Sequence, residues 1–282
     1  MRALAVHPDV LVVVSRVWQT TAALVRAPAS SAGATPPAAA LAGGEGPAPR
    51  EAFLVDSPIY PDELELTAQV ARQAGFAVAG LLATHGDWDH LLGRIAFPDA
   101  ALGVSETTGA RLTARPGDPA RELRAFDTEH YVQRDKGLGL GELQTLPVPG
   151  RIGLSDAAGD DPDGTEHELE LHAADGHTAD GMAIWVPWAR TLICGDYLSP
   201  VEIPTWHEAD GSRSGYRAAL DRLRPLAEQA DWVIPGHGGP IDGQRAMAIW
   251  REDVAYVEDG TMPIARSDRR QKDLDRANRA VG

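Results

Sequence analysis

Four apolar segments of this sequence each end at a turn that carries histidine or aspartate. The first, residues 78–84, leads directly into His-Gly-Asp-Trp-Asp-His. The other three lead into Asp-Gly-His at 175–177, Gly-Asp at 195–196 and Gly-His at 236–237. Glycine allows the backbone to turn tightly at the end of a strand and to bring a side chain toward a crowded centre. The pattern therefore requires a fold that gathers the ends of several buried strands in one place.

The turn after the first segment is the densest in potential metal ligands. Asp87 and Asp89 lie in one confined loop, where two carboxylates repel each other unless a cation lies between them. Histidine and aspartate side chains at such turns are typical ligands of divalent metals. Taken from all four turns, the candidate metal ligands are His85, Asp87, Asp89, His90, His177, Asp196 and His237.

The order of these residues resembles the metallo-β-lactamase superfamily over roughly residues 10–258. The motif of that family is His-x-His-x-Asp-His, followed by a Gly-His, an Asp after a strand and a Gly-His near the C-terminus. The resemblance implies an α/β (α+β) fold, a four-layer αββα sandwich of two mixed β-sheets with helices on the outer faces, with two metals at one edge. It also implies a ligand set for each metal: His85, Asp87 and His177 for the first, Asp89, His90 and His237 for the second, and Asp196 as the bridge between them.

The chain departs from the family motif at Asp87, where the family usually has histidine. The nearest variation is that of flavodiiron proteins, which carry glutamate at this position and hold two irons. A carboxylate in place of an imidazole makes a site harder and more anionic, which moves its preference from zinc toward iron or manganese. We expect two divalent metal ions, zinc first, with iron or manganese as the alternatives that Asp87 introduces.

Several residues near the ligands are further candidates for the site. In relatives the loop after the bridging aspartate lines the pocket, so Tyr197, Trp206 and His207 are candidate substrate contacts, the alternative being packed or surface side chains. Asp56 follows a strand and is expected to support the metal loop. Cys194, the only cysteine, excludes an internal disulfide and is expected to be a small core side chain. The remaining histidines, expected to be structural or exposed, are His7, His130, His167 and His172.

The leading functional hypothesis is a dinuclear metallohydrolase in which a metal-bridged water of lowered pKa supplies hydroxide. Asp89 would orient that nucleophile and accept its proton. A fold does not fix a substrate. The substrate class that we expect is a small ester, thioester or lactone. The alternatives are a non-haem iron oxidoreductase, flavodiiron-like or persulfide dioxygenase-like, which Asp87 favours, and a metal-binding protein without catalysis.

Composition limits the partners of the chain. The sequence has 26 Lys and Arg against 41 Asp and Glu, a formal net charge of −15. That balance disfavours nucleic acid and anionic membranes as partners, so we expect a small-molecule substrate. No segment approaches the ~18 apolar residues of a membrane span. The apolar run at 10–14 is shorter than the roughly 7–15 residues of a signal-peptide core, so we expect a cytoplasmic protein.

We expect one domain over residues 1–260 and a charged C-terminal tail, 261–282, that frays. Residues 28–50 are mostly Ala, Pro and Gly and are expected to form a flexible loop. The acidic stretch 156–168 is expected to be a solvated hairpin tip. Strands are expected near 10–14, 17–21, 52–56, 78–84, 101–105, 142–148, 168–174, 181–187, 191–195 and 232–234, and helices near 61–74, 118–136, 214–229 and 243–258.

Overall fold

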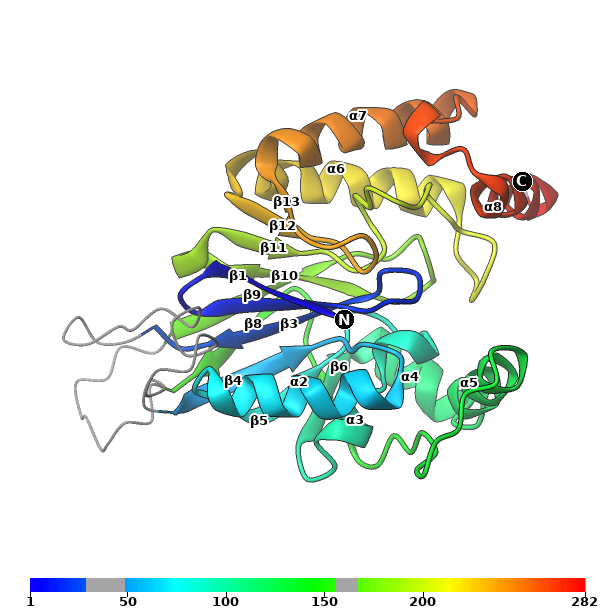
Figure 1. Cartoon of the computed structure of the whole chain (residues 1–282). Coiled ribbons are helices and arrows are strands. Elements are labelled where there is room, and N and C mark those ends of the chain that lie inside the picture. The colour runs from blue at the N-terminus through cyan, green and yellow to red at the C-terminus, as the bar shows by residue number, and fades with distance from the viewer. Residues whose placement is uncertain (29–48, 156–166, 282) are drawn as a thin grey trace.

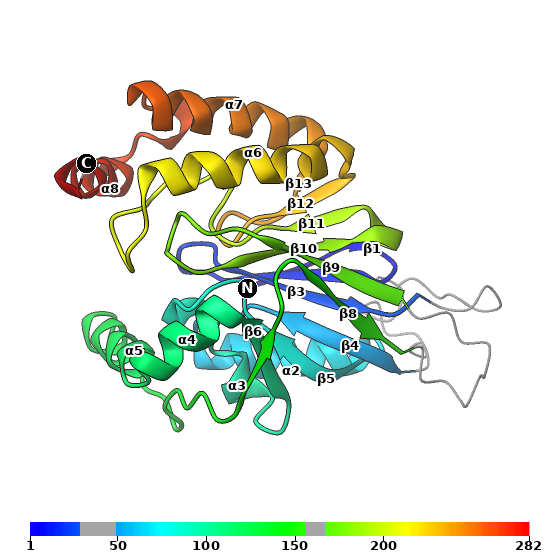
Figure 2. The same cartoon turned by 180° about the vertical axis from the view of Figure 1, so that it is seen from behind.

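Two β-sheets face each other in the computed structural model, which describes residues 1–28, 49–155 and 167–281. Helices cover the outer face of each sheet, so the layers follow one another as helix, sheet, sheet and helix (Figure 1). The view from behind shows the same layers (Figure 2). The expected αββα sandwich is confirmed.

The first sheet has seven strands that lie in chain order. They are β1 (Arg2–His7), β2 (Val10–Val14), β3 (Thr21–Arg26), β4 (Arg50–Val55), β5 (Phe76–Leu82), β6 (Ala101–Ser105) and β7 (Leu143–Leu146). Neighbours from β1 to β4 are antiparallel, and neighbours from β4 to β7 are parallel. The parallel part is connected by helices, as such crossovers require. They are α2 (Pro61–Gln73), α3 (Gly93–Ala96), α4 (Glu106–Ala114) and α5 (Asp118–Glu129).

The second sheet has six strands. In spatial order they are β13 (Ile241–Asp242), β12 (Trp232–Ile234), β11 (Thr191–Ile193), β10 (Met182–Val186), β9 (His167–Ala173) and β8 (Gly150–Leu154). Only the pair β11 and β12 is parallel. The helices of this half are α6 (Arg213–Gln229), α7 (Gly243–Asp259) and α8 (Arg269–Val281), and the first two lie over the outer face of the sheet (Figure 1).

Strand β2 shows why the sequence has uninterrupted apolar runs. Successive side chains of a strand point to opposite faces of its sheet. Val12 belongs to the cluster between the two sheets, together with Ile184, whereas Leu11 belongs to the cluster beneath the helices, together with Leu64. Both faces of the strand are buried, so all five of its residues are apolar.

Backbone hydrogen bonds join the ends of strands both between the two sheets and within the second sheet. The Met182 amide donates to the Thr84 carbonyl, the Gly236 amide to the Gly195 carbonyl, and the Thr21 amide to the Gly236 carbonyl, each at 2.7 Å. These bonds bring the turns that follow β5, β11 and β12 to one edge of the sandwich. The candidate ligands on those turns are therefore neighbours in space.

The structure differs from the expected strand at 17–21. The chain turns there, with positive φ at Trp18 (51°) and Gln19 (52°), and the strand begins at Thr21. Trp18 is instead part of an aromatic group, with its ring 5.8 Å from that of Trp88. β-branched and aromatic residues favour strands, but this packing requires a turn. The expected helix at 118–136 also ends earlier, at Glu129.

The C-terminal segment is also different from the expectation of a frayed tail. Residues 269–281 form α8, and its polar side chains Gln271 and Asn278 are buried. Charge and the terminal position suggested fraying, but buried amides that hydrogen-bond to another segment leave no hydropathy signal. The low-complexity stretch and the acidic tip fall mainly outside the described residues. Across the described ranges, no helix is both long and apolar enough to cross a membrane.

Candidate metal centre

Asp196 lies at the meeting point of the four turns. Its Oδ2 is 3.3 Å from His177 Nε2, 3.4 Å from His237 Nε2 and 3.9 Å from His85 Nε2, and its Oδ1 is 3.4 Å from His90 Nε2. One carboxylate thus faces four imidazoles, as a bridging ligand between two metal positions would. Gly236 makes this approach possible, because a Cβ there would collide with Asp196 Oδ1.

The candidate ligands form two groups whose ligand atoms all lie within 4.8 Å of one another. These groups are His85, His177 and Asp196, and Asp89, His90 and His237. The second group contains the three residues expected for the second metal position, whereas the first contains His85 and His177 with Asp196 and lacks Asp87. A third group joins Glu202 to Asp196 and His237, and no sequence pattern had singled out Glu202.

The ligand atoms fit a pair of cations. His85 Nε2, His90 Nε2 and Asp196 Oδ1 are buried and have no hydrogen-bond partner among the described residues. Polar atoms that are buried without a partner cost free energy, and a bound divalent ion would satisfy all three. Histidine and carboxylate donors are those that zinc, iron and manganese accept, so the residues present fit the metals expected.

Each imidazole directs its Nε2 toward the centre, and its Nδ1 faces an oxygen outside it. Such outer oxygens fix the orientation of metal-binding histidines. The nearest are Thr84 Oγ1 at 3.1 Å for His85, Asp56 Oδ2 at 3.0 Å for His90, the Thr205 carbonyl at 2.9 Å for His177 and the Trp18 carbonyl at 3.2 Å for His237. Asp56 therefore lies where the sequence placed it, behind the metal loop, and it also accepts a hydrogen bond from the Thr84 amide.

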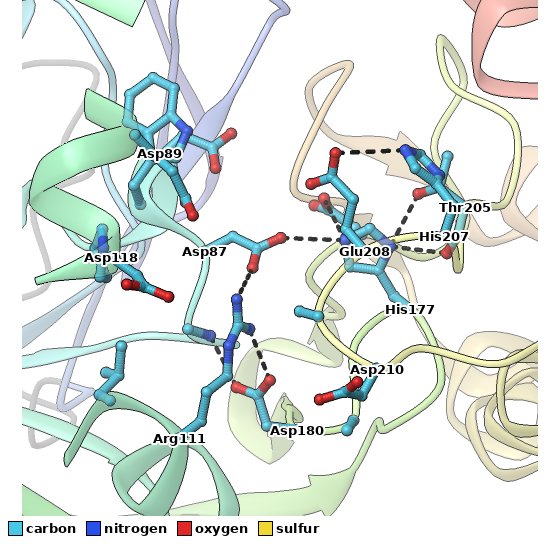
Figure 3. Close-up of a pocket in the computed structure, with 18 of the residues that line it drawn as sticks. Asp87, Asp89, Arg111, Asp118, His177, Asp180, Thr205, His207, Glu208 and Asp210 are labelled. Atoms are coloured by element: carbon cyan, nitrogen blue, oxygen red, sulfur yellow. Dashed lines mark hydrogen bonds and ion pairs between the residues drawn. The ribbon is translucent and has the colours of Figure 1, made fainter. Parts of the chain in front are cut away.

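Asp87 faces the first metal position with one oxygen and an arginine with the other. Its Oδ2 lies 3.4 Å from His85 Nε2 and 3.6 Å from His177 Nε2. Its Oδ1 accepts a hydrogen bond of 2.6 Å from Arg111, which also donates to Asp180 at 2.8 Å (Figure 3). The departure from the family motif is therefore part of a carboxylate–guanidinium–carboxylate row.

Asp180 ties this row to the metal loop. It accepts hydrogen bonds from the Gly86 amide at 2.9 Å and from Thr108 Oγ1 at 2.8 Å, in addition to Arg111. Burial alone would raise the pKa of Asp180, but the Arg111 guanidinium and these donors hold it below its usual range. The side chain is therefore a buried, ionised anchor for the turn between His85 and Asp87.

The pKa of each site carboxylate follows from its neighbours. Burial favours the neutral form of Asp196, but the His237 and His90 imidazoles hold its pKa well below the usual range. Burial likewise opposes ionisation of Asp87, and the His85 imidazole lowers its pKa. For Asp89 burial prevails and raises the pKa. Asp89 is thus the site carboxylate most disposed to take up a proton.

A pocket of about 780 Å³ opens above the centre. Asp87, Asp89, His177 and His207 are among the residues that line it. His207 is therefore placed as expected for a substrate contact. In Figure 3 it lies close to Thr205, beside His177.

Tyr197 and Trp206 differ from the expectation of substrate contacts. Both side chains belong to the apolar cluster of the second half, and neither lines this pocket. Tyr197 instead supports a ligand from behind, because its hydroxyl accepts a hydrogen bond of 2.9 Å from the His177 amide. Cys194 is buried in the same cluster, and burial raises the pKa of its thiol well above the usual range. It is a core side chain, as expected.

Sequence reasoning missed several residues that surround the ligands. Asp180 follows His177 by three residues and is a weak signal that could have been noticed. Glu202, 3.9 Å from His237 Nδ1, and its partner Arg270 lie in segments without a motif. Arg111 belongs to α4, which is not among the expected helices.

The comparison with protein families identifies the chain. Residues 42–237, more than half of the sequence, match the family model of the metallo-β-lactamase superfamily. With the sandwich fold and the ligand groups at its edge, the chain belongs to this superfamily.

Several solved structures share the fold. The DIM-1 metallo-β-lactamase exposed to ceftazidime is 18% identical, with a TM-score of 0.55 over 92% of this chain and 97% of that one. A metallo-β-lactamase family protein of Thermus thermophilus, TTHA1429, is 18% identical, with a TM-score of 0.58 over 88% and 80%. TTHA1623, in a di-iron-bound form, is 17% identical, with a TM-score of 0.56 over 83% and 96%. At these identities the likeness shows the fold alone.

The chain is also similar to part of a curated protein. A linear primary-alkylsulfatase of Pseudomonas sp. is 29% identical over 141 residues, which cover 46% of this chain and 26% of the relative. The chain thus spans about a quarter of that protein.

Proposed function

We propose that this chain is a dinuclear metal-dependent hydrolase that acts on a small ester, thioester or lactone. The observation that carries the proposal is the position of Asp196, whose two oxygens face four histidine Nε2 atoms from two ligand groups. The pocket opens directly onto this point. Membership of the superfamily supports hydrolysis as the type of reaction.

Different residues of the chain would hold the two metals. His85, Asp87 and His177 would hold one metal, Asp89, His90 and His237 the other, and Asp196 both. Bound metals would supply a water of lowered pKa and polarise the substrate carbonyl. Asp89 lines the pocket and belongs to the second ligand group, so this carboxylate would orient the attacking water and accept its proton.

The charges of the pocket favour an uncharged substrate. Among the described residues, nine carboxylates and three guanidinium groups line it. Two of the three arginines have carboxylate partners, since Arg111 lies between Asp87 and Asp180 and Arg270 pairs with Glu202. Two divalent cations would offset four of the nine carboxylates, and the lining would still carry a net negative charge, which disfavours an anionic substrate such as a sulfate ester. A neutral ester, thioester or lactone avoids this repulsion.

A second candidate function is a non-haem iron oxidoreductase. Asp87 supports it, because this carboxylate lies within 3.6 Å of His85 Nε2 and His177 Nε2, where the family motif has an imidazole. A harder ligand set favours iron. Oxygen consumption with thiol or persulfide substrates, in the absence of ester hydrolysis, would favour this candidate.

The test is hydrolysis of a panel of neutral esters, thioesters and lactones, with an alkyl sulfate of matched chain length. We expect turnover of a neutral substrate and little turnover of the sulfate. His90→Ala or His237→Ala should remove nearly all activity and at least one metal. His172→Ala is the matched control, because His172 lies on β9 and is partly exposed. Full turnover by His237→Ala with unchanged metal content would contradict the proposal.

A further inference from the structure

The C-terminal helix α8 is hydrogen-bonded to the loop that follows Asp196. Asn278 is fully buried, and its amide binds the backbone on both sides of Thr205. Its Oδ1 accepts a hydrogen bond of 3.0 Å from the Trp206 amide, and its Nδ2 donates to the Pro204 carbonyl at 2.8 Å. The loop backbone between these two contacts is therefore held by a single side chain that is 72 residues away in sequence.

Thr205, which lies between these two contacts, orients the candidate metal ligand His177. The Thr205 carbonyl lies 2.9 Å from His177 Nδ1. Thr205 Oγ1 lies 2.9 Å from the same nitrogen, so both oxygens of Thr205 hold the His177 ring by its Nδ1. His177 Nε2, on the other side of the ring, is thereby directed at the centre, where it lies 3.3 Å from Asp196 Oδ2.

Further contacts fasten α8 along the same loop. Gln271, also buried, accepts a hydrogen bond of 2.8 Å from the Ile203 amide, and Arg270 pairs with Glu202. Asn278 is itself anchored to α7, because its Nδ2 also donates to the Tyr256 hydroxyl at 3.1 Å. The loop at 202–206 is thus bound to α8 at three successive places.

We propose that Asn278 is a positioning residue for the first metal position, acting through the backbone of Thr205 on the orientation of the His177 ring. The proposal rests on the metal centre of the proposed function. It makes α8 a part of the site and assigns it a role that no motif of the chain indicates. Asn278 Oδ1 also lies 3.2 Å from Nδ1 of His207, which lines the pocket, so the same side chain connects the helix to both the metal ligand and the pocket.

The first experiment is zinc titration of the metal-free chain against a chromophoric chelator. In Asn278→Leu, a side chain of similar size that cannot hydrogen-bond, we expect one of the two zinc ions to bind about 10–100-fold more weakly, the usual effect of losing a partner behind a ligand. The other should change less than about threefold, because His90 and His237 take their oxygen partners from elsewhere. Arg276→Ala, an exposed α8 residue paired only with Asp273, is the control and should bind both ions normally.

The second experiment needs no variant. Nitrogen-15 NMR of the histidine side chains of the zinc-loaded wild type should show His177 bound to zinc through Nε2, with a proton on Nδ1 that exchanges slowly because Thr205 accepts it. Asn278→Leu should speed that exchange. A wild-type His177 that binds zinc through Nδ1 would overturn the proposal, whether or not the variant folds. So would a folded Asn278→Leu that binds both zinc ions with wild-type affinity. If wild type bound no zinc, the proposed function would fail, and the orientation of the His177 ring in crystals of the metal-free chain would still test the contact between Thr205 and His177.

Discussion

Replacing Asp180 by asparagine should destabilise the fold by removing the anchor of the metal loop. All three partners of Asp180 are donors: the Gly86 amide, Thr108 Oγ1 and the Arg111 guanidinium. In Asp180→Asn one end of the side chain becomes a donor as well, so whichever way it turns, two donors face each other.

The magnitude follows from the burial of these groups. A hydrogen bond to a charged group contributes about 1.5–3 kcal/mol. Arg111 is 27% exposed, which weakens its share through solvent screening. We therefore expect the free energy of unfolding to fall by about 2–3 kcal/mol, or the Tm by about 4–12 °C for a domain of this size.

Urea unfolding in the presence of a chelator measures this change without a contribution from metal binding. Because the pKa of Asp180 is lowered in the folded chain from its ordinary value of 3.8, its stabilisation is complete above that value and is lost as the pH falls further. The difference between wild type and variant should thus be equal at pH 7 and pH 5 and should shrink below about pH 4. Asp221→Asn, which alters an exposed pair with Arg217, is the control. A loss below about 1 kcal/mol, or one that grows on acidification, would refute the reasoning.

Two further predictions concern the metals. Asp87→His introduces the family's usual ligand but leaves Arg111 facing an imidazole in place of its carboxylate partner; calorimetry should therefore show tighter zinc binding in Asp87→His/Arg111→Met than in Asp87→His. Tighter zinc binding in Asp87→His alone would mean that Arg111 does not need a carboxylate at position 87. Removal of metal should lower the Tm, because each ion at 100 times its Kd stabilises the folded chain by about 2.7 kcal/mol. A Tm that is insensitive to chelator would contradict this.

The parts of the site that the sequence predicts are those encoded locally. A buried strand, a glycine and a ligand follow one another at His177, Asp196 and His237, so periodicity and turn chemistry suffice to find them. The fold follows for the same reason, because strands buried on both faces, such as β2, are continuous apolar runs. Most of the expected elements accordingly appear near their expected bounds.

The parts that the sequence does not predict depend on contacts between distant segments. Asn278 and Trp206 are joined across 72 residues, and Arg111 reaches Asp180 across 69. An arginine or asparagine that is buried against a distant partner adds nothing to the hydrophobic periodicity of its own segment. Trp18 has strand propensity but lies in a turn, since its ring packs against Trp88. Tertiary packing overrides local preference at such positions.

The most direct test of the central claim is the metal content of the chain, by elemental analysis of protein purified without added metal or chelator. The account predicts about two divalent ions per chain, which fall to one or none in His237→Ala. Zinc or manganese would support the hydrolase, and iron the oxidoreductase. A chain that binds no metal, even after dialysis against zinc, manganese or iron, would contradict the account.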